Sequence, residues 1–117
     1  MSDLQSQLPL NPRVFAILVS LLEAPAHGYR IRQDVEERSH GTIVLDPGSL
    51  YRTIAKLLDD GVIEEVDTPK GEVSDDPRRR YYGVTAFGRD LAAAEAARLR
   101  SLLSRPVLSP SALRGGR

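Results

Sequence analysis

The sequence predicts a mainly α-helical fold with one small β-hairpin, and three observations lead to this prediction. Apolar residues recur at helical spacing in several segments, two of which begin with an Asn-Pro or Asp-Pro pair. Only two segments, 62–67 and 80–85, are rich in the Val, Ile and Tyr that favour strands. With 117 residues, 5% aromatic residues and no Trp, the chain has material for one core built mainly from aliphatic side chains.

Two helices are expected at the start of the chain. Asn11 can accept hydrogen bonds from free backbone amides and Pro12 suits the first helical turn, so a helix begins there and runs to about Glu23. After a Pro-containing turn, a second helix is expected at 29–39, where Gly41 ends it. Both segments place apolar residues three and four apart, as core-facing helices do.

A third helix is expected to begin at Asp46 and Pro47, which repeat the pairing of a cap with a proline. Gly61 supplies the stop at its C-terminal end. Its buried stripe is expected to consist of Leu50, Ile54, Leu57 and Leu58.

The strand candidates 62–67 and 80–85 form a hairpin around a long loop, 68–79. Thr85 then caps a fourth helix, expected at 86–103. Three helices, a strand, a wing loop, a strand and a further helix make the order of a winged helix-turn-helix. In that fold the third helix can enter the major groove of DNA.

This order predicts four parts of the chain. Residues 11–85 form a winged helix-turn-helix DNA-binding domain, and residues 86–103 form a C-terminal dimerisation helix. Residues 1–10 are expected to be a flexible N-terminal arm. Residues 104–117 combine Pro, Ser, Gly and Arg without apolar periodicity, which predicts a flexible tail.

The composition argues against several classes of protein. The chain has no Cys and two His, so a disulfide scaffold, a thiolate metal site and a Cys nucleophile are excluded. It has no phosphate-binding Gly loop and no Gly-x-Ser-x-Gly motif, which predicts that it is not an enzyme and needs no cofactor. Without a signal peptide or a long apolar run, it is expected to be cytoplasmic and not bound to a membrane.

The exposed side of the third helix is the first candidate site. At about 100° per residue, Arg52 points away from the apolar stripe, with Lys56 and Ser49 beside it. Such side chains suit phosphates and guanine edges, although they could also form an ordinary solvated face. Tyr51 lies at the edge of the stripe, where its hydroxyl could reach a phosphate or its ring could pack against the first helix.

A second basic cluster, Arg78, Arg79 and Arg80, lies at the end of the hairpin loop and is a candidate phosphate contact. The alternative is an ordinary charged loop in which Asp75 and Asp76 pair with these arginines. The net charge is zero, so double-stranded DNA binding rests on the distribution of charge and not on its sum. A winged-helix module that binds only other proteins therefore remains the alternative function.

The fourth helix carries more apolar residues than a small core needs, which predicts a homodimer interface. The residues expected there are Phe87, Leu91, Leu99, Leu102 and Leu103. The two histidines are assigned less specific roles. His27, just before a helix start, is expected to bond a nearby backbone group, and His40 to lie exposed at a helix end.

These residues together resemble the phenolic-acid-decarboxylase-regulator family, usually called PadR-like regulators. The resemblance extends over 16–103 and implies a winged-helix dimer that represses transcription, with the C-terminal helix as its interface. It also implies that Tyr51 faces DNA and that the chain is of the small subtype, with a short C-terminal helix. Gly83 departs from the pattern, which has a larger or charged residue there. The motifs that carry the resemblance are Ile17-Leu18, His27-Gly28-Tyr29-Arg30-Ile31, Gly48-Ser49-Leu50-Tyr51-Arg52, Leu57, Gly61-Val62-Ile63 and Arg79-Arg80-Tyr81-Tyr82-Gly83-Val84-Thr85 with Gly88.

The resemblance does not identify a small-molecule effector. A ligand pocket between the first and fourth helices, near Phe15, is a further alternative. The sequence favours repression of a near-palindromic operator by a homodimer.

Overall fold

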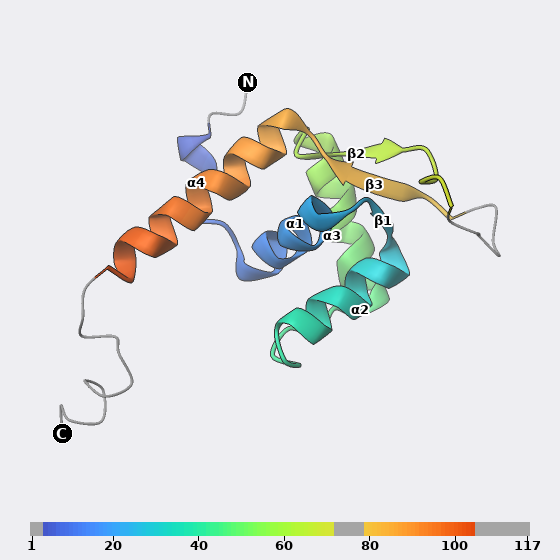
Figure 1. The fold of residues 1–117 in the computed structure, drawn as a ribbon, viewed down its shortest axis with the longest axis horizontal. Coiled ribbons are helices and arrows are strands. Elements are labelled where there is room, and N and C mark those ends of the chain that lie inside the picture. The colour runs from blue at the N-terminus through green and yellow to red at the C-terminus, as the bar shows by residue number, and fades with distance from the viewer. Residues whose placement is uncertain (1–3, 72–78, 105–117) are drawn as a thin grey trace.

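A computed structural model describes residues 4–71 and 79–104 of the chain. The described elements are α-helices packed around a small antiparallel sheet, as predicted (Figure 1). In chain order they are η1 (Gln5–Gln7), a short 3-10 helix, α1 (Pro12–Glu23), β1 (Ala26–His27), α2 (Gly28–Arg38), α3 (Pro47–Asp59), β2 (Ile63–Val66), β3 (Tyr81–Val84) and α4 (Ala86–Leu102).

Three helices begin at the caps that the sequence predicted. The Asn11 side chain accepts a hydrogen bond from the Arg13 amide at 2.8 Å, directly before α1. Asp46 accepts one from the Ser49 amide at 2.9 Å, before α3. Thr85 accepts one at 3.0 Å at the start of α4. Each bond satisfies an amide that has no partner inside its helix, so these short-range rules fix where the helices begin.

The sheet has the strand order β1-β3-β2, with both pairs antiparallel. The predicted hairpin is present, and Ile63 pairs with Val84 in its register. The sequence predicted a plain turn where β1 lies, so that expectation was wrong. Strand β1 has two residues and forms because Ala26 lies opposite Tyr82 of β3, a long-range contact that local sequence does not reveal.

The core lies between the helices and the sheet. Its fully buried side chains come from each of the four α-helices and from the hairpin, and α1 lies in the middle of the molecule against α2, α4 and β3 (Figure 1). The side chains with less than 2% of their surface exposed are Ile17, Leu18, Ile31, Val35, Leu50, Val62, Ile63 and Leu91.

The N-terminal segment differs from the flexible arm that the sequence predicted. Leu4 and Leu8 pack against the core and Leu10 is 9% exposed, so residues 4–10 are held by apolar contacts. Three leucines in a short segment interrupted by Pro9 do not form a sustained helical or strand period, which is why the sequence alone did not indicate burial. The predicted tail, 104–117, lies outside the described residues beyond Ser104. Within residues 4–71 and 79–104, no helix is long and apolar enough to cross a membrane.

Candidate nucleic-acid interface

Helix α3 has one face fixed in the core and one face open to solvent. Leu50, Ile54 and Leu57 are at most 5% exposed, and they form the stripe that the sequence predicted. Leu58 was assigned to this stripe, but it is 37% exposed. The assignment fails because Leu58 lies at the edge of the stripe, where it lines a pocket on one flank of α3.

Arg52 is exposed on the open face of α3, with Lys56 one turn further along the helix. The Lys56 side chain is 74% exposed and its ammonium lies 3.2 Å from an Asp60 carboxylate oxygen, four residues on. An exposed pair of this kind contributes about 0–1 kcal/mol, so Lys56 can leave it for a phosphate at little cost. Ser49 is half-buried on the same helix and its carbonyl accepts a hydrogen bond from the Thr53 hydroxyl at 2.9 Å.

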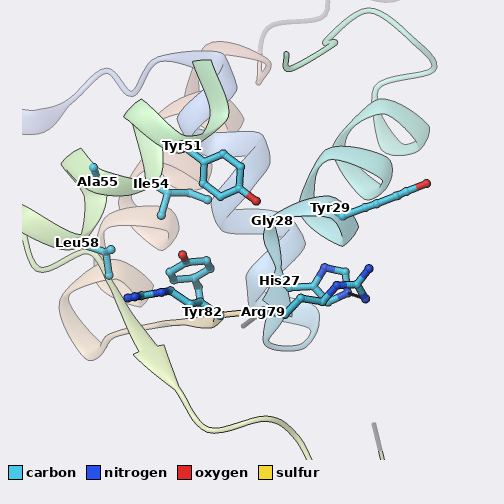
Figure 2. Close-up of a pocket in the computed structure, with 10 residues that line it drawn as sticks. His27, Gly28, Tyr29, Tyr51, Ile54, Ala55, Leu58, Arg79 and Tyr82 are labelled. Atoms are coloured by element: carbon cyan, nitrogen blue, oxygen red, sulfur yellow. Dashed lines mark hydrogen bonds between the residues drawn. The ribbon is translucent and has the colours of Figure 1, made fainter. Parts of the chain in front are cut away.

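Tyr51 is 52% exposed and projects from α3 toward the start of α2 (Figure 2). A side-chain carbon added at Gly28 would lie 2.5 Å from the Tyr51 hydroxyl oxygen. The absence of a side chain at Gly28 therefore makes room for the Tyr51 hydroxyl. The structure places the Tyr51 hydroxyl against the start of α2, whereas the structural alternative from the sequence named the first helix as its packing partner.

Two of the three predicted loop arginines, Arg79 and Arg80, lie directly before β3 and line a pocket together with Tyr51 of α3. We call this side of α3 its wing flank. Arg80 reaches across the hairpin to Glu65, with 3.2 Å between guanidinium and carboxylate. A guanidinium nitrogen of Arg79 lies 3.5 Å from Nε2 of His27. Both arginines are exposed. Arg78, the third, lies outside the described residues, as do Asp75 and Asp76.

A pocket of about 490 Å³ separates α3 from β1, α2 and the wing. In Figure 2 the Tyr51 and Tyr82 side chains line this pocket together with the exposed Leu58, and Tyr29 is a further lining residue. Burial raises the pKa of the Tyr82 phenol, helped by the nearby Tyr51 and Glu65, so Tyr82 is a neutral hydroxyl at physiological pH. Neutral hydroxyls and guanidinium groups are donors that suit phosphate oxygens.

The two histidines take structural positions. Nδ1 of His27 accepts a hydrogen bond from the Arg30 amide at 3.2 Å, which caps α2 and confirms the predicted backbone role. His40 is exposed after α2 with a left-handed φ of 52°. In the part of the chain that the structure describes, no three His, Asp or Glu side chains are grouped as a metal site would require.

The candidate dimer residues of α4 divide into two groups. Leu91 is 0% exposed, so it belongs to the core of its own chain and has no surface for a partner. Phe87 is half-buried and packs against the same core. Leu99 is also half-buried, whereas Leu102 and Leu103 are 59% and 61% exposed. The apolar surface open to a partner therefore lies at the C-terminal end of α4.

Sequence reasoning missed two features near α3. Arg13, in the first turn of α1, lines a groove on the flank of α3 opposite Tyr51. Glu95 is 3% exposed in α4, where Arg98 binds both of its carboxylate oxygens at 2.7 and 2.9 Å. The spacing of Glu95 and Arg98, three residues apart, could have indicated the ion pair. No sequence signal could have placed Arg13 beside α3.

The arrangement described so far is a winged helix-turn-helix whose third helix has Arg52 and Lys56 on its exposed face. Residues 17–94 match the model of the transcriptional regulator PadR-like family. The chain belongs to this family. The resemblance inferred from the sequence is thereby confirmed. PadR-like proteins are DNA-binding transcriptional regulators and not enzymes, which is also what the sequence predicted.

Two solved structures are similar to this PadR-like regulator in fold, and one further protein is similar to it in sequence. A PadR family transcription regulator from Clostridium difficile R20291 is 20% identical, with a TM-score of 0.66 over 80% of this chain and 93% of that one. A PadR-like transcriptional regulator from Bacillus cereus is 18% identical, with a TM-score of 0.64 over 86% and 88%. "Uncharacterized protein X" of Lysinibacillus sphaericus is 33% identical over 73 residues, which cover 62% of this chain and 64% of that protein.

Proposed function

We propose that this PadR-like regulator is a cytoplasmic, homodimeric repressor that contacts a near-palindromic operator with α3. The observation that carries the proposal is the position of Arg52 and Lys56 on the open face of a helix whose other face is locked in the core. Membership of a family of DNA-binding regulators supports it. Bound at a promoter, such a dimer would exclude RNA polymerase from the same DNA.

The charges at the two ends of α3 favour its N-terminal half as the part that enters the groove. Asp59 and Asp60 lie at the C-terminal end, whereas the N-terminal end has one carboxylate, Asp46, which is bonded to the Ser49 amide. Carboxylates are repelled by phosphates, and Arg52 lies in the first half of the helix, so that half is the part proposed to approach base edges. This orientation agrees with that of recognition helices in helix-turn-helix proteins generally.

Each candidate residue has a proposed role. Arg52 donates to a guanine edge in the major groove, because a guanidinium can bond O6 and N7 together. Lys56 and Ser49 bond phosphates beside it. Tyr51 and the wing residues Arg78, Arg79 and Arg80 bond the backbone on the wing side of α3.

Two parts of the chain have separate proposed roles. Residues 11–85 bind DNA, whereas 86–103 hold two chains together, so that two copies of α3 face successive half-sites. Their centres should then lie about one helical turn, or a multiple of it, apart.

The test compares Arg52→Ala with Lys56→Ala in DNA-binding titrations at several salt concentrations, on an operator selected from random DNA. Arg52→Ala should weaken the preferred site by about 1 to 3 kcal/mol and relax sequence choice at one position in each half-site. Lys56→Ala should weaken all DNA about equally and lower the salt slope by about one, because it removes a phosphate contact.

The control is Leu57→Ala, which removes a buried side chain from the same helix. It should cost about 2 to 5 kcal/mol of stability and reduce binding only through unfolding. If the two surface variants stay folded and keep full affinity, sequence preference and salt slope, α3 is not the contact. The protein-binding alternative would then replace the proposal.

A further inference from the structure

A second groove runs along α3, on the flank opposite Tyr51 and the wing. It has a volume of about 420 Å³ and lies between the N-terminal segment, the first turn of α1 and α3. The residues that matter for its chemistry are Gln7, Asn11, Arg13, Ser49, Arg52 and Lys56. Arg13 is the member that neither the sequence nor the proposed function assigns.

The charges of this groove favour an anion. Arg13, Arg52 and Lys56 line it, against a single lining carboxylate, that of Asp60, which already pairs with Lys56. Among residues 4–71 and 79–104, Arg13 has no carboxylate within ion-pair distance, whereas Arg52 interacts electrostatically with the nearby Asp46 carboxylate. The guanidinium group of Arg13 is therefore the one most available to an anionic partner.

The walls of the groove are held in place. The Arg13 amide donates to the Asn11 side chain at 2.8 Å, which fixes the start of α1. Leu10, another lining residue, is 9% exposed and its amide donates to the buried carboxylate of Glu95 in α4. Apolar contacts of Leu4 and Leu8 hold the segment before it. Arg13 thus projects from a fixed position beside α3.

The width of the major groove of DNA indicates what the Arg13 side chain would contact. A helix in the major groove has a phosphate backbone on each side, because the groove is only about 12 Å wide. The wing arginines lie on one flank of α3 and Arg13 lies on the other. From this placement we infer that Arg13 bonds a backbone phosphate of the strand that borders α3 on the side away from the wing. This inference rests on the proposed contact of α3 with DNA.

The test uses Arg13→Gln and Arg13→Lys in the full-length protein, with the same titrations across salt. Arg13→Gln should weaken binding to specific and nonspecific DNA alike, about three- to tenfold, and lower the salt slope by about one. Arg13→Lys keeps the charge and should restore most of the slope. Arg89→Gln, which removes another exposed arginine, at the start of α4, is the matched control and should change neither quantity.

A second measurement locates the contact on the DNA. Single phosphates of the operator are replaced by neutral methylphosphonates, and affinity is measured for the wild type and Arg13→Gln. One replacement at the border of the half-site should weaken the wild type but have no further effect on Arg13→Gln. Thermal unfolding should be the same for all variants, since the Arg13 side chain is exposed.

These measurements distinguish failure of the Arg13 contact from failure of the α3 contact with DNA. If Arg13→Gln keeps the wild-type salt slope while Arg52→Ala loses affinity, the Arg13 contact is wrong and the α3 contact stands. If every methylphosphonate affects both proteins equally, the Arg13 contact is also wrong. If the wild type itself binds no DNA in salt-dependent fashion, the proposed function fails, and the Arg13 inference fails with it.

Discussion

Glu95 shows how a single buried charge is stabilised in this protein. Its carboxylate receives two hydrogen bonds from Arg98 and one from the Leu10 amide, while 3% of its surface is exposed. The bond from Arg98, followed by that from Leu10, holds the pKa of Glu95 below its ordinary value of 4.5, although burial acts in the opposite direction. Glu95 therefore links α4 to the segment beside α3.

This lowered pKa predicts acid sensitivity. A carboxylate whose pKa is lower in the folded chain stabilises the fold fully above its unfolded pKa, and the stabilisation is lost as pH falls through the folded pKa. The free energy of unfolding, measured by denaturant titration, should decrease below about pH 4.5, and Glu95→Gln should flatten that decrease.

The matched variant is Arg98→Gln, which leaves the Glu95 carboxylate buried without its cation. It should be destabilised at neutral pH and recover part of the loss on acidification, because protonation removes the unpaired buried charge. Equal pH profiles for the wild type and Glu95→Gln would contradict this role. Asp46, whose pKa is lowered mainly by the Ser49 amide, contributes with the same sign and is unchanged in both variants.

Residue-scale prediction from the sequence succeeded where the interaction is local. The caps Asn11, Asp46 and Thr85 act within three residues of themselves, so the sequence contains all the information they need. Leu91 and Leu58 were misassigned because both lie in apolar helix positions, and only the packing of distant elements decides which becomes buried. Arg13 was missed for the same reason.

At the scale of elements, helices were easier to predict than short strands. The four α-helices have apolar periodicity and capped or stopped ends, which local sequence encodes. Strand β1 exists through its pairing with β3, and the N-terminal segment is ordered through contacts with the core. Neither segment is long enough to show a helical or strand period in the sequence. Long-range contacts therefore determine the structure of both.

The junction of α4 with the hairpin gives a prediction at this scale. Gly88 lies in the first turn of α4, and a side-chain carbon there would overlap the Val62 carbonyl oxygen and lie 2.7 Å from a methyl carbon of Val84. Ala favours a helix over Gly by about 1 kcal/mol, but the overlap involves backbone that cannot move aside. Gly88→Ala should therefore lower the free energy of unfolding by about 1 to 3 kcal/mol.

Gly48→Ala is the control for this comparison. The same added carbon in α3 would meet only side-chain atoms of Arg52 and Asp46, each at 3.4 Å. Chemical denaturation should show unchanged or slightly higher stability for Gly48→Ala, because the helix preference of Ala is then unopposed. Stabilisation by Gly88→Ala would show that α4 can shift away from Val62, and the argument for a close junction would fail.

At the scale of the whole molecule, α4 extends away from the body that α1, α2 and α3 form (Figure 1). One face of its first half is buried, with Leu91 and Ala92 in the core, whereas its last turn exposes Leu102. The sequence predicted the winged helix, and its prediction of a dimer interface, which stays a prediction, placed that interface along the whole of α4. The structure narrows the surface open to a partner to the last turns, because the earlier apolar residues are needed for the chain's own core.

The last prediction concerns that surface. Replacing Leu99 and Leu102 together by Glu should convert a dimer into a monomer, because pairing two such helices would bury unpaired carboxylates. Light scattering at micromolar concentration gives the mass, and circular dichroism should show an unchanged helical fold. Binding to a complete operator should weaken strongly while binding to one half-site changes little, since the dimer gains affinity by joining two contacts. Ala97→Glu, an exposed position on the opposite side of α4 from Leu99, should leave the dimer intact. A monomeric wild type, or a double variant that remains dimeric, would exclude the end of α4 as the interface and require the two α3 helices to be paired by another surface.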